Sequence, residues 1–209
     1  LALIGHGSRK SDGNAEIHAL AARLPGLVTV GFIELASPSA EEALDRAAAL
    51  ADEVVAVPAV LLAAAHAKND VPLAVARARI RHPGVRFFAA RPLGVHPGMV
   101  GALADRFADV APTEEPARTA VLLVGRGSSD PDANADLHKI ARLFAERRGF
   151  FDVGVAYVGV TTPNVEDAFR ALVARRPRAI VVLPYLLYPG VLVDRLRVQL
   201  VELAALHPR

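Results

Sequence analysis

Short apolar runs alternate with longer amphipathic stretches along the whole chain. Runs of about four to eight apolar residues predict strands, and stretches with a period near 3.6 residues predict helices. In the first half, strands are predicted at residues 1–5, 28–34, 53–60 and 85–90, and helices at about 14–24, 40–50, 72–81 and 97–107. Because strands that alternate with helices are joined by crossovers, we expect a mostly parallel sheet with helices on both faces.

The same alternation restarts after a polar, proline-rich stretch at residues 109–118, which is typical of a linker. The elements expected after it are strands at 120–125, 153–160 and 179–184, and helices at 132–148, 164–175 and 191–206. We therefore expect an α/β lobe at residues 1–110 and a second α/β lobe at 119–209.

Individual residues indicate that the two halves are copies of one unit. LIGHGSR at residues 3–9 is repeated as LLVGRGS at 122–128, and FIELASPSAEEAL at 32–44 as YVGVTTPNVEDAF at 157–169. Such self-similarity predicts an internal duplication. HPG at 82–84 parallels HPR at the end of the chain, so the second lobe is expected to be truncated, without a fourth strand and helix. The first residues already resemble a strand interior, and we expect the given sequence to be part of a longer one.

Composition and charge narrow the classes of function. No apolar run approaches the roughly 20 residues of a membrane span, so no membrane partner is expected. The net charge is +2 and no dense Lys/Arg run is interleaved with aromatics, which permits an acidic small-molecule ligand and does not favour nucleic acid. Cysteine is absent, which excludes disulfides and thiolate chemistry. No signal-peptide pattern is found, and a cytoplasmic location is expected.

Three chemically versatile side chains stand where predicted strands end. His6 follows the first strand, Glu34 ends the second and His66 follows the third. Parallel α/β sheets bind ligands at the carboxyl ends of their strands. Imidazole and carboxylate groups suit divalent first-row metals, and both accept protons. The pattern predicts a joint metal and catalytic site.

The second copy lacks all three of these side chains. In the repeat register Arg126 replaces His6 and Gly159 replaces Glu34, while His66 falls opposite a leucine. Residues needed only for packing would be tolerated equally in both copies, so their joint replacement favours a site in the first lobe alone. The other interpretation is that a histidine beside glycines is an ordinary turn residue.

The Gly-Ser segments around Ser8 and Ser128 carry a second hypothesis. Their backbone N–H groups and the helices that follow are able to bind anions. Neither segment matches a complete dinucleotide or P-loop motif, and GHGS lacks the context of a nucleophile elbow. The remaining histidines are assigned to packing, helix surfaces or helix ends: His18, His82, His96, His138 and His207.

Together these motifs resemble the sirohydrochlorin chelatase family, the CbiX/SirB-type class II chelatases in their long, duplicated form. The resemblance rests on LIGHGSR, FIELASPS, PAVLLAAAH followed by DVP, and PLGVHP. In the second half, VGRGSSDPDANADLHKIARL and LPYLLYPGVLVDRL resemble the degenerate half of the family. The likeness covers essentially the whole chain. One departure is Ala65, since family members often have glycine before the histidine.

The resemblance implies two flavodoxin-like lobes that face each other across a cleft. It also implies insertion of Co²⁺ or Fe²⁺ into sirohydrochlorin, for cobalamin or sirohaem biosynthesis, with no cofactor beyond the substrate metal; Ni²⁺ remains open. His6 and His66 match the paired active-site histidines of the family, and Glu34 matches their acidic partner. Because duplication replaces a homodimer, we expect a monomer.

An acidic tetrapyrrole would favour cationic residues in the opposite lobe. We expect Arg126 to bind its carboxylates, because guanidinium pairs with carboxylate in bidentate fashion. Ser8, Arg9 and Ser128 are further candidates for substrate binding. Two alternatives remain. The first is a metal or tetrapyrrole carrier without turnover. The second is a phosphoester- or nucleotide-binding protein that uses the Gly-Ser segments, in which Glu34 and His66 would have no role.

Overall fold

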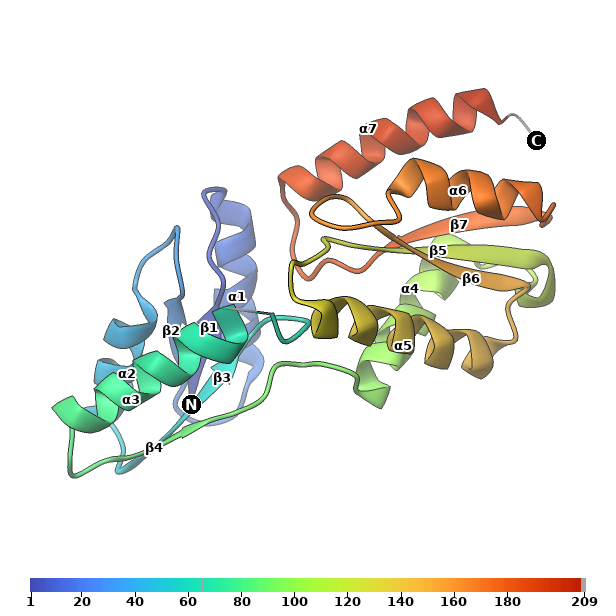
Figure 1. Cartoon of the computed structure of the whole chain (residues 1–209). Coiled ribbons are helices and arrows are strands. Elements are labelled where there is room, and N and C mark those ends of the chain that lie inside the picture. Colours follow the sequence, from blue (N-terminus) through green and yellow to red (C-terminus); the bar gives the residue numbers. More distant parts are fainter. Residues whose placement is uncertain (65, 208–209) are drawn as a thin grey trace. The chain divides into compact units, whose positions relative to one another are not determined.

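The computed structural model describes residues 1–64 and 66–207, and for His66 the backbone alone. The chain forms two compact α/β units, Leu1–Gly94 and Val95–Arg209 (Figure 1). Each unit contains a parallel sheet, as the alternation of strands and helices predicts.

The sheet of the first unit has β1 at its centre. Its strands are β1 (Ala2–Gly5), β2 (Thr29–Phe32), β3 (Glu53–Pro58) and β4 (Arg86–Ala89), in the order β2-β1-β3-β4. This order is that of a flavodoxin-like doubly wound sheet. In the register, Ile4 of β1 lies opposite Gly31 of β2 and Pro58 of β3, so these three strands end close together at one edge.

Helices cover both faces of this sheet (Figure 1). α2 (Ala40–Ala48) and α3 (Val71–Arg81) pack on one face through buried alanines, which allow a close approach to the strands. α1 (Ser11–Arg23) packs on the other face through Ile17. A short π-helix, η1 (His66–Asp70), leads into α3.

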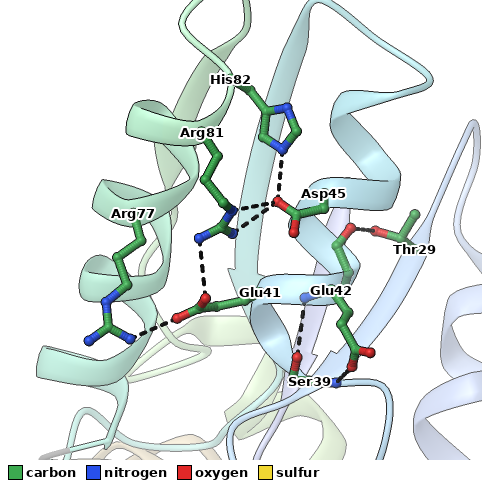
Figure 2. Close-up of polar contacts among 9 residues, drawn as sticks. Thr29, Ser39, Glu41, Glu42, Asp45, Arg77, Arg81 and His82 are labelled. Carbon is green, nitrogen blue, oxygen red and sulfur yellow. Dashed lines mark hydrogen bonds and ion pairs between the residues drawn. The ribbon is translucent and has the colours of Figure 1, made fainter.

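Ion pairs join α2 to α3 on their outer surface (Figure 2). We call Glu41, Asp45, Arg77, Arg81 and His82 the Asp45 cluster. Arg81 Nη2 lies 2.9 Å from Asp45 Oδ1, and His82 Nε2 lies 2.8 Å from the same oxygen. Glu41 receives Arg77 Nη1 at 2.8 Å. Burial tends to raise the pKa of Asp45, but the hydrogen bonds and charges of His82 and Arg81 outweigh it and hold that pKa below its ordinary value.

The second unit repeats the first three strands of the first unit. β5 (Thr119–Gly125), β6 (Asp152–Tyr157) and β7 (Ala179–Pro184) are ordered β6-β5-β7. α6 (Val165–Ala174) and α7 (Val191–Leu206) cover one face, and α5 (Pro131–Arg148) covers the other (Figure 1). A short 3₁₀ helix, η2 (Pro116–Arg118), precedes β5.

Helix α4 (Pro97–Val110) packs within the second unit, although the sequence analysis assigns it to the first lobe. The ring of Phe107 lies edge-on to Phe150 at 4.8 Å, and Phe150 contacts Phe144 of α5 at the same distance. Arg148 Nη2 donates a hydrogen bond to the carbonyl of Ala104 at 3.1 Å. The compact units therefore divide the chain before α4, whereas the linker at 109–118 follows it.

The elements lie close to their predicted positions. The largest differences are at element ends: α1 begins at Ser11 rather than residue 14, α4 continues to Val110 rather than residue 107, and β6 ends at Tyr157 rather than residue 160. In the described part of the chain, no helix combines the length and apolar character needed to cross a membrane.

Candidate metal and substrate site

The site is built from the loops that follow β1 and β2. Their backbones are joined by two hydrogen bonds: Ile33 N–H donates to the carbonyl of Gly5 at 2.9 Å, and Glu34 N–H donates to that of His6 at 3.0 Å. These bonds extend the β1–β2 pairing beyond the sheet. They hold His6 and Glu34 side by side at its carboxyl edge.

The side chains of His6 and Glu34 meet there. His6 Nε2 lies 3.4 Å from Glu34 Oε1, and the two side chains are 33% and 45% exposed. An imidazole nitrogen and a carboxylate oxygen at this spacing can bind one divalent ion between them. The structure thus brings together two of the three predicted metal ligands.

The other ring nitrogen of His6 has a backbone partner. His6 Nδ1 lies 3.2 Å from the carbonyl oxygen of Gly7. Since a carbonyl only accepts, a hydrogen bond here requires the hydrogen on Nδ1, and in that tautomer of the neutral ring the lone pair lies on Nε2, the atom that lies near Glu34. Metals bind the neutral imidazole, so this tautomer suits a metal ion at Nε2.

Gly7 allows the two loops to approach. Its φ is +94°, and a Cβ at this position would collide with the carbonyl oxygen of Glu34. The second unit has the same arrangement, since Gly127 has φ +86° and a Cβ there would collide with the carbonyl oxygen of Gly159. Only glycine fits such a position, which explains why both copies retain it.

Ser8 and Ser128 shape their loops. Ser8 N–H donates to Asn14 Oδ1 at 2.9 Å, and Asn14 Nδ2 donates back to the carbonyl of Ser8 at 2.8 Å. Ser128 and Asn134 make the same two bonds at 3.0 and 2.8 Å. The backbone N–H groups of both serines are thus engaged, which weakens the hypothesis that they bind anions.

The serine hydroxyls also have local partners. Ser8 Oγ accepts from the N–H of Lys10 at 3.1 Å, and Ser128 Oγ accepts from that of Asp130 at 3.0 Å. Each hydroxyl still has a hydrogen to donate. Substrate binding by Ser8 and Ser128 stays a prediction.

The loop after β2 has a strained tip. Leu35 has φ +62°, and its counterpart Val160 after β6 has φ +69°. A non-glycine residue in this region costs about 1–3 kcal/mol. Phe32 N–H, donating to the carbonyl of Pro38 at 2.9 Å, closes the loop, and Tyr157 N–H does the same with Pro163 at 3.0 Å. The left-handed conformation of Leu35 was not predicted from the sequence, although both copies place an apolar residue at this turn.

The third predicted ligand falls at the edge of the described structure. His66 is the first residue of η1, after the loop that leaves β3, but its side chain lies outside the described residues, as does Ala65. Among the residues that the structure describes, no group of three or more His, Asp or Glu side chains is placed to hold a metal. His66 therefore stays a prediction.

Arg126 occupies in the second unit the position that His6 occupies in the first. Gly159 N–H donates to its carbonyl at 3.1 Å, as Glu34 N–H does to His6. Arg126 and Arg9 are both exposed. Each therefore extends a cationic side chain into solvent at the carboxyl edge of its own unit.

Comparison with known proteins decides the family. The family model CbiX matches residues 1–110 and 120–209. The chain belongs to the CbiX family. This confirms the resemblance predicted from the sequence motifs.

Two bacterial relatives of this CbiX chain are named for different metals. It is 37% identical over 202 residues to a sirohydrochlorin cobaltochelatase of Priestia megaterium, covering 92% of the chain and 65% of that relative. It is 32% identical over 211 residues to a sirohydrochlorin ferrochelatase of Bacillus subtilis, covering 98% and 80%. The chain thus spans less than two thirds of the cobaltochelatase.

Solved structures show the same fold as this CbiX chain. SirB from Bacillus subtilis with Fe³⁺ aligns with a TM-score of 0.87 and 30% identity, over 98% of the chain and 82% of SirB. A cobalt complex of the sirohydrochlorin chelatase SirB from Bacillus subtilis subspecies spizizenii aligns with a TM-score of 0.82 and 30% identity. This alignment covers 99% of the chain and 82% of that structure. These alignments confirm the predicted chelatase-type α/β fold.

Proposed function

We propose that this chain is a sirohydrochlorin chelatase that inserts Co²⁺ or Fe²⁺ into the tetrapyrrole. The observation that carries the proposal is the His6–Glu34 pair, held by backbone hydrogen bonds at the carboxyl edge of a CbiX-family unit. Relatives named for insertion of either metal match most of the chain. We propose a monomer in the cytoplasm; sedimentation and cell fractionation test these two points.

The reaction requires two tasks that the pair can perform. A hydrated divalent ion must exchange water for pyrrole nitrogens, and two pyrrole N–H protons must leave. His6 and Glu34, with His66 as the third predicted ligand, hold the ion through nitrogen and oxygen donors, which release it more readily than thiolates. As the metal moves to the ring, the lone pair of His6 Nε2 and the carboxylate of Glu34 become free to accept the protons.

Substrate binding is assigned to cationic and polar side chains of both units. Sirohydrochlorin is a polycarboxylate, and an arginine retains its charge at every physiological pH. We assign carboxylate binding to Arg126, with Arg9, Ser8 and Ser128 as further contacts. The exposure of Arg126, and its replacement of the metal-binding residue in the second copy, support this assignment.

An anaerobic assay that follows the absorption change of sirohydrochlorin on addition of Co²⁺ or Fe²⁺ tests the function. We expect His6→Ala, His66→Ala and Glu34→Gln each to lower kcat/KM by about 100-fold or more, since proton transfer and metal binding are both impaired. The control is His18→Ala, an exposed histidine on α1. Wild-type activity in a His6→Ala, His66→Ala double variant would refute the residue assignment.

The same assay separates the alternatives. A carrier predicts stoichiometric binding of metal or tetrapyrrole without insertion. Competition between Co²⁺ and Fe²⁺, with Ni²⁺ as a third ion, identifies the preferred metal, which nitrogen and oxygen ligands alone do not determine.

A further inference from the structure

Leu35 is an exposed apolar residue beside the metal donors. It follows Glu34 directly in the chain, and the residue is 49% exposed. Leucine is a poor choice for a left-handed turn in water, where asparagine or glycine would adopt φ +62° with less strain. Its backbone conformation and its exposure are therefore both unfavourable for a leucine in water.

The second unit repeats this combination. Val160 has φ +69° and is 66% exposed, at the same position after β6. A β-branched residue is especially strained in this region. The duplicated loops therefore share an exposed aliphatic side chain at the tip, although the metal donors differ between them. A strained position retained in both copies points to a function.

The loop that carries Leu35 is held at both ends. Its first residues are bonded to the β1 loop through Ile33 and Glu34, and its end is closed by the bond from Phe32 to Pro38. Ser39 then caps the start of α2 with a capping box, in which Ser39 and Glu42 exchange hydrogen bonds. The exposed side chain of Leu35 is thus presented on a fixed backbone, so that little entropy is lost when a ligand contacts it.

The chemistry of the reaction indicates what this side chain contacts. A metal bound to His6 and Glu34 enters a planar macrocycle through one of its flat faces, because the nitrogen atoms that receive it lie at the ring centre. Exposed residues next to the metal donors are placed where they can contact the same surface. That surface is apolar, whereas the carboxylates lie on the rim. An aliphatic side chain beside Glu34 matches the face, and a polar one would lose hydration there.

We propose that Leu35 is a positioning residue that packs against the face of the tetrapyrrole and aligns its centre with the His6–Glu34 pair. This inference rests on the proposed function. It assigns to Leu35 a part of the binding of the tetrapyrrole and no part of the binding of the metal. Val160 presents an equivalent apolar contact at the carboxyl edge of the second unit.

The decisive variant is Leu35→Asn, with Leu35→Met as the conservative replacement. Asparagine tolerates the left-handed conformation, so the variant should unfold at the same temperature as the wild type or higher. Loss of the apolar contact should raise the KM for sirohydrochlorin roughly three- to tenfold, with the KM for Co²⁺ unchanged. Leu35→Met retains the apolar surface and should stay close to the wild type. Leu50→Asn, a similarly exposed leucine beyond the end of α2, is the matched control.

Two results would overturn the proposal. An unchanged KM for sirohydrochlorin in Leu35→Asn shows that the side chain does not contact the ring. An equal rise in the KM for Co²⁺ shows that Leu35 acts through Glu34. Failure of the proposed function is a separate result, since the wild type would then insert no metal into sirohydrochlorin.

Discussion

At the scale of single residues, the site depends on positions that permit two loops to touch. The carbonyl oxygen of Glu34 occupies the space that a side chain at Gly7 would need. The contact that places Glu34 beside His6 is therefore made by backbone atoms. The side chains of His6 and Glu34 take no part in this loop contact.

Gly7→Ala tests this dependence. The new Cβ would collide with the Glu34 carbonyl, and the alanine would have to adopt the left-handed backbone conformation of Gly7. We therefore expect a loss of about 2–4 kcal/mol in the free energy of unfolding, measured by urea denaturation. Gly84→Ala, whose Cβ would meet open space, should change it by no more than about 1 kcal/mol. Equal stability of the two variants would contradict the proposed loop contact.

The sequence predicted the meeting of His6 and Glu34 but not the conformation of the loops that carry them. His6 and Glu34 could be predicted because parallel strands deliver their following loops to one edge. The left-handed conformation of Leu35 could not be predicted, since leucine has no preference of its own for this region. The Ser8–Asn14 clamp was also missed, although both residues recur in the second copy as Ser128 and Asn134.

At the scale of elements, the Asp45 cluster ties α2 to α3. Asp45 is the centre of the cluster because a single oxygen receives both Arg81 and His82. The pKa of Asp45 is lower in the folded chain than its ordinary value of 3.8. A lowered carboxyl pKa stabilises the fold above the unfolded-state value, and this contribution disappears as the pH falls through the folded-state value.

Asp45→Asn is therefore expected to destabilise the fold in a pH-dependent way. Because the side chain is partly exposed, we expect a loss of about 1 kcal/mol near pH 5–6, which shrinks as the pH falls below about 4. Chemical denaturation across this range measures it. The control is Asp109→Asn, which removes a single exposed pair with Arg106 and should cost about 0.5 kcal/mol or less. A difference between wild type and Asp45→Asn that is independent of pH would exclude this role of Asp45.

At the scale of the whole molecule, two copies of one unit share a backbone and differ in chemistry. The bond from Gly159 to Arg126 corresponds to the bond from Glu34 to His6. A Cβ on Gly159 would meet open space, and its φ lies outside the left-handed region. The second unit can therefore accept the side chains that it lacks.

We expect Arg126→His with Gly159→Glu to create a second metal-binding pair. In a His6→Ala, Glu34→Gln background, calorimetric titration with Co²⁺ should show a weak binding step in the quadruple variant. The step should be weak because leucine stands opposite His66 in this copy. Arg126→His alone, in the same background, is the control and should show no such step. Its absence from the quadruple variant would mean that the two loop pairs are not interchangeable.

The sequence repeat predicted this equivalence but not the place of every helix. Its periodicity identified α4 as a helix with an apolar face. Periodicity does not predict which element packs against that face. In the structure α4 packs against α5, next to the Phe144–Phe150 contact. Adjacency in sequence favoured the first lobe, whereas packing places the helix in the second unit.

The packing of α4 determines where the chain can be separated into independent fragments. Cleavage in the linker at 109–118 would leave the first fragment with a terminal helix that exposes Val100, Leu103 and Phe107 to water. It would also uncover Phe150 in the second fragment, and both products would tend to aggregate. Separation between Gly94 and Val95 leaves these apolar surfaces covered. The junction for domain exchange or circular permutation is therefore the short segment before α4, and not the proline-rich stretch.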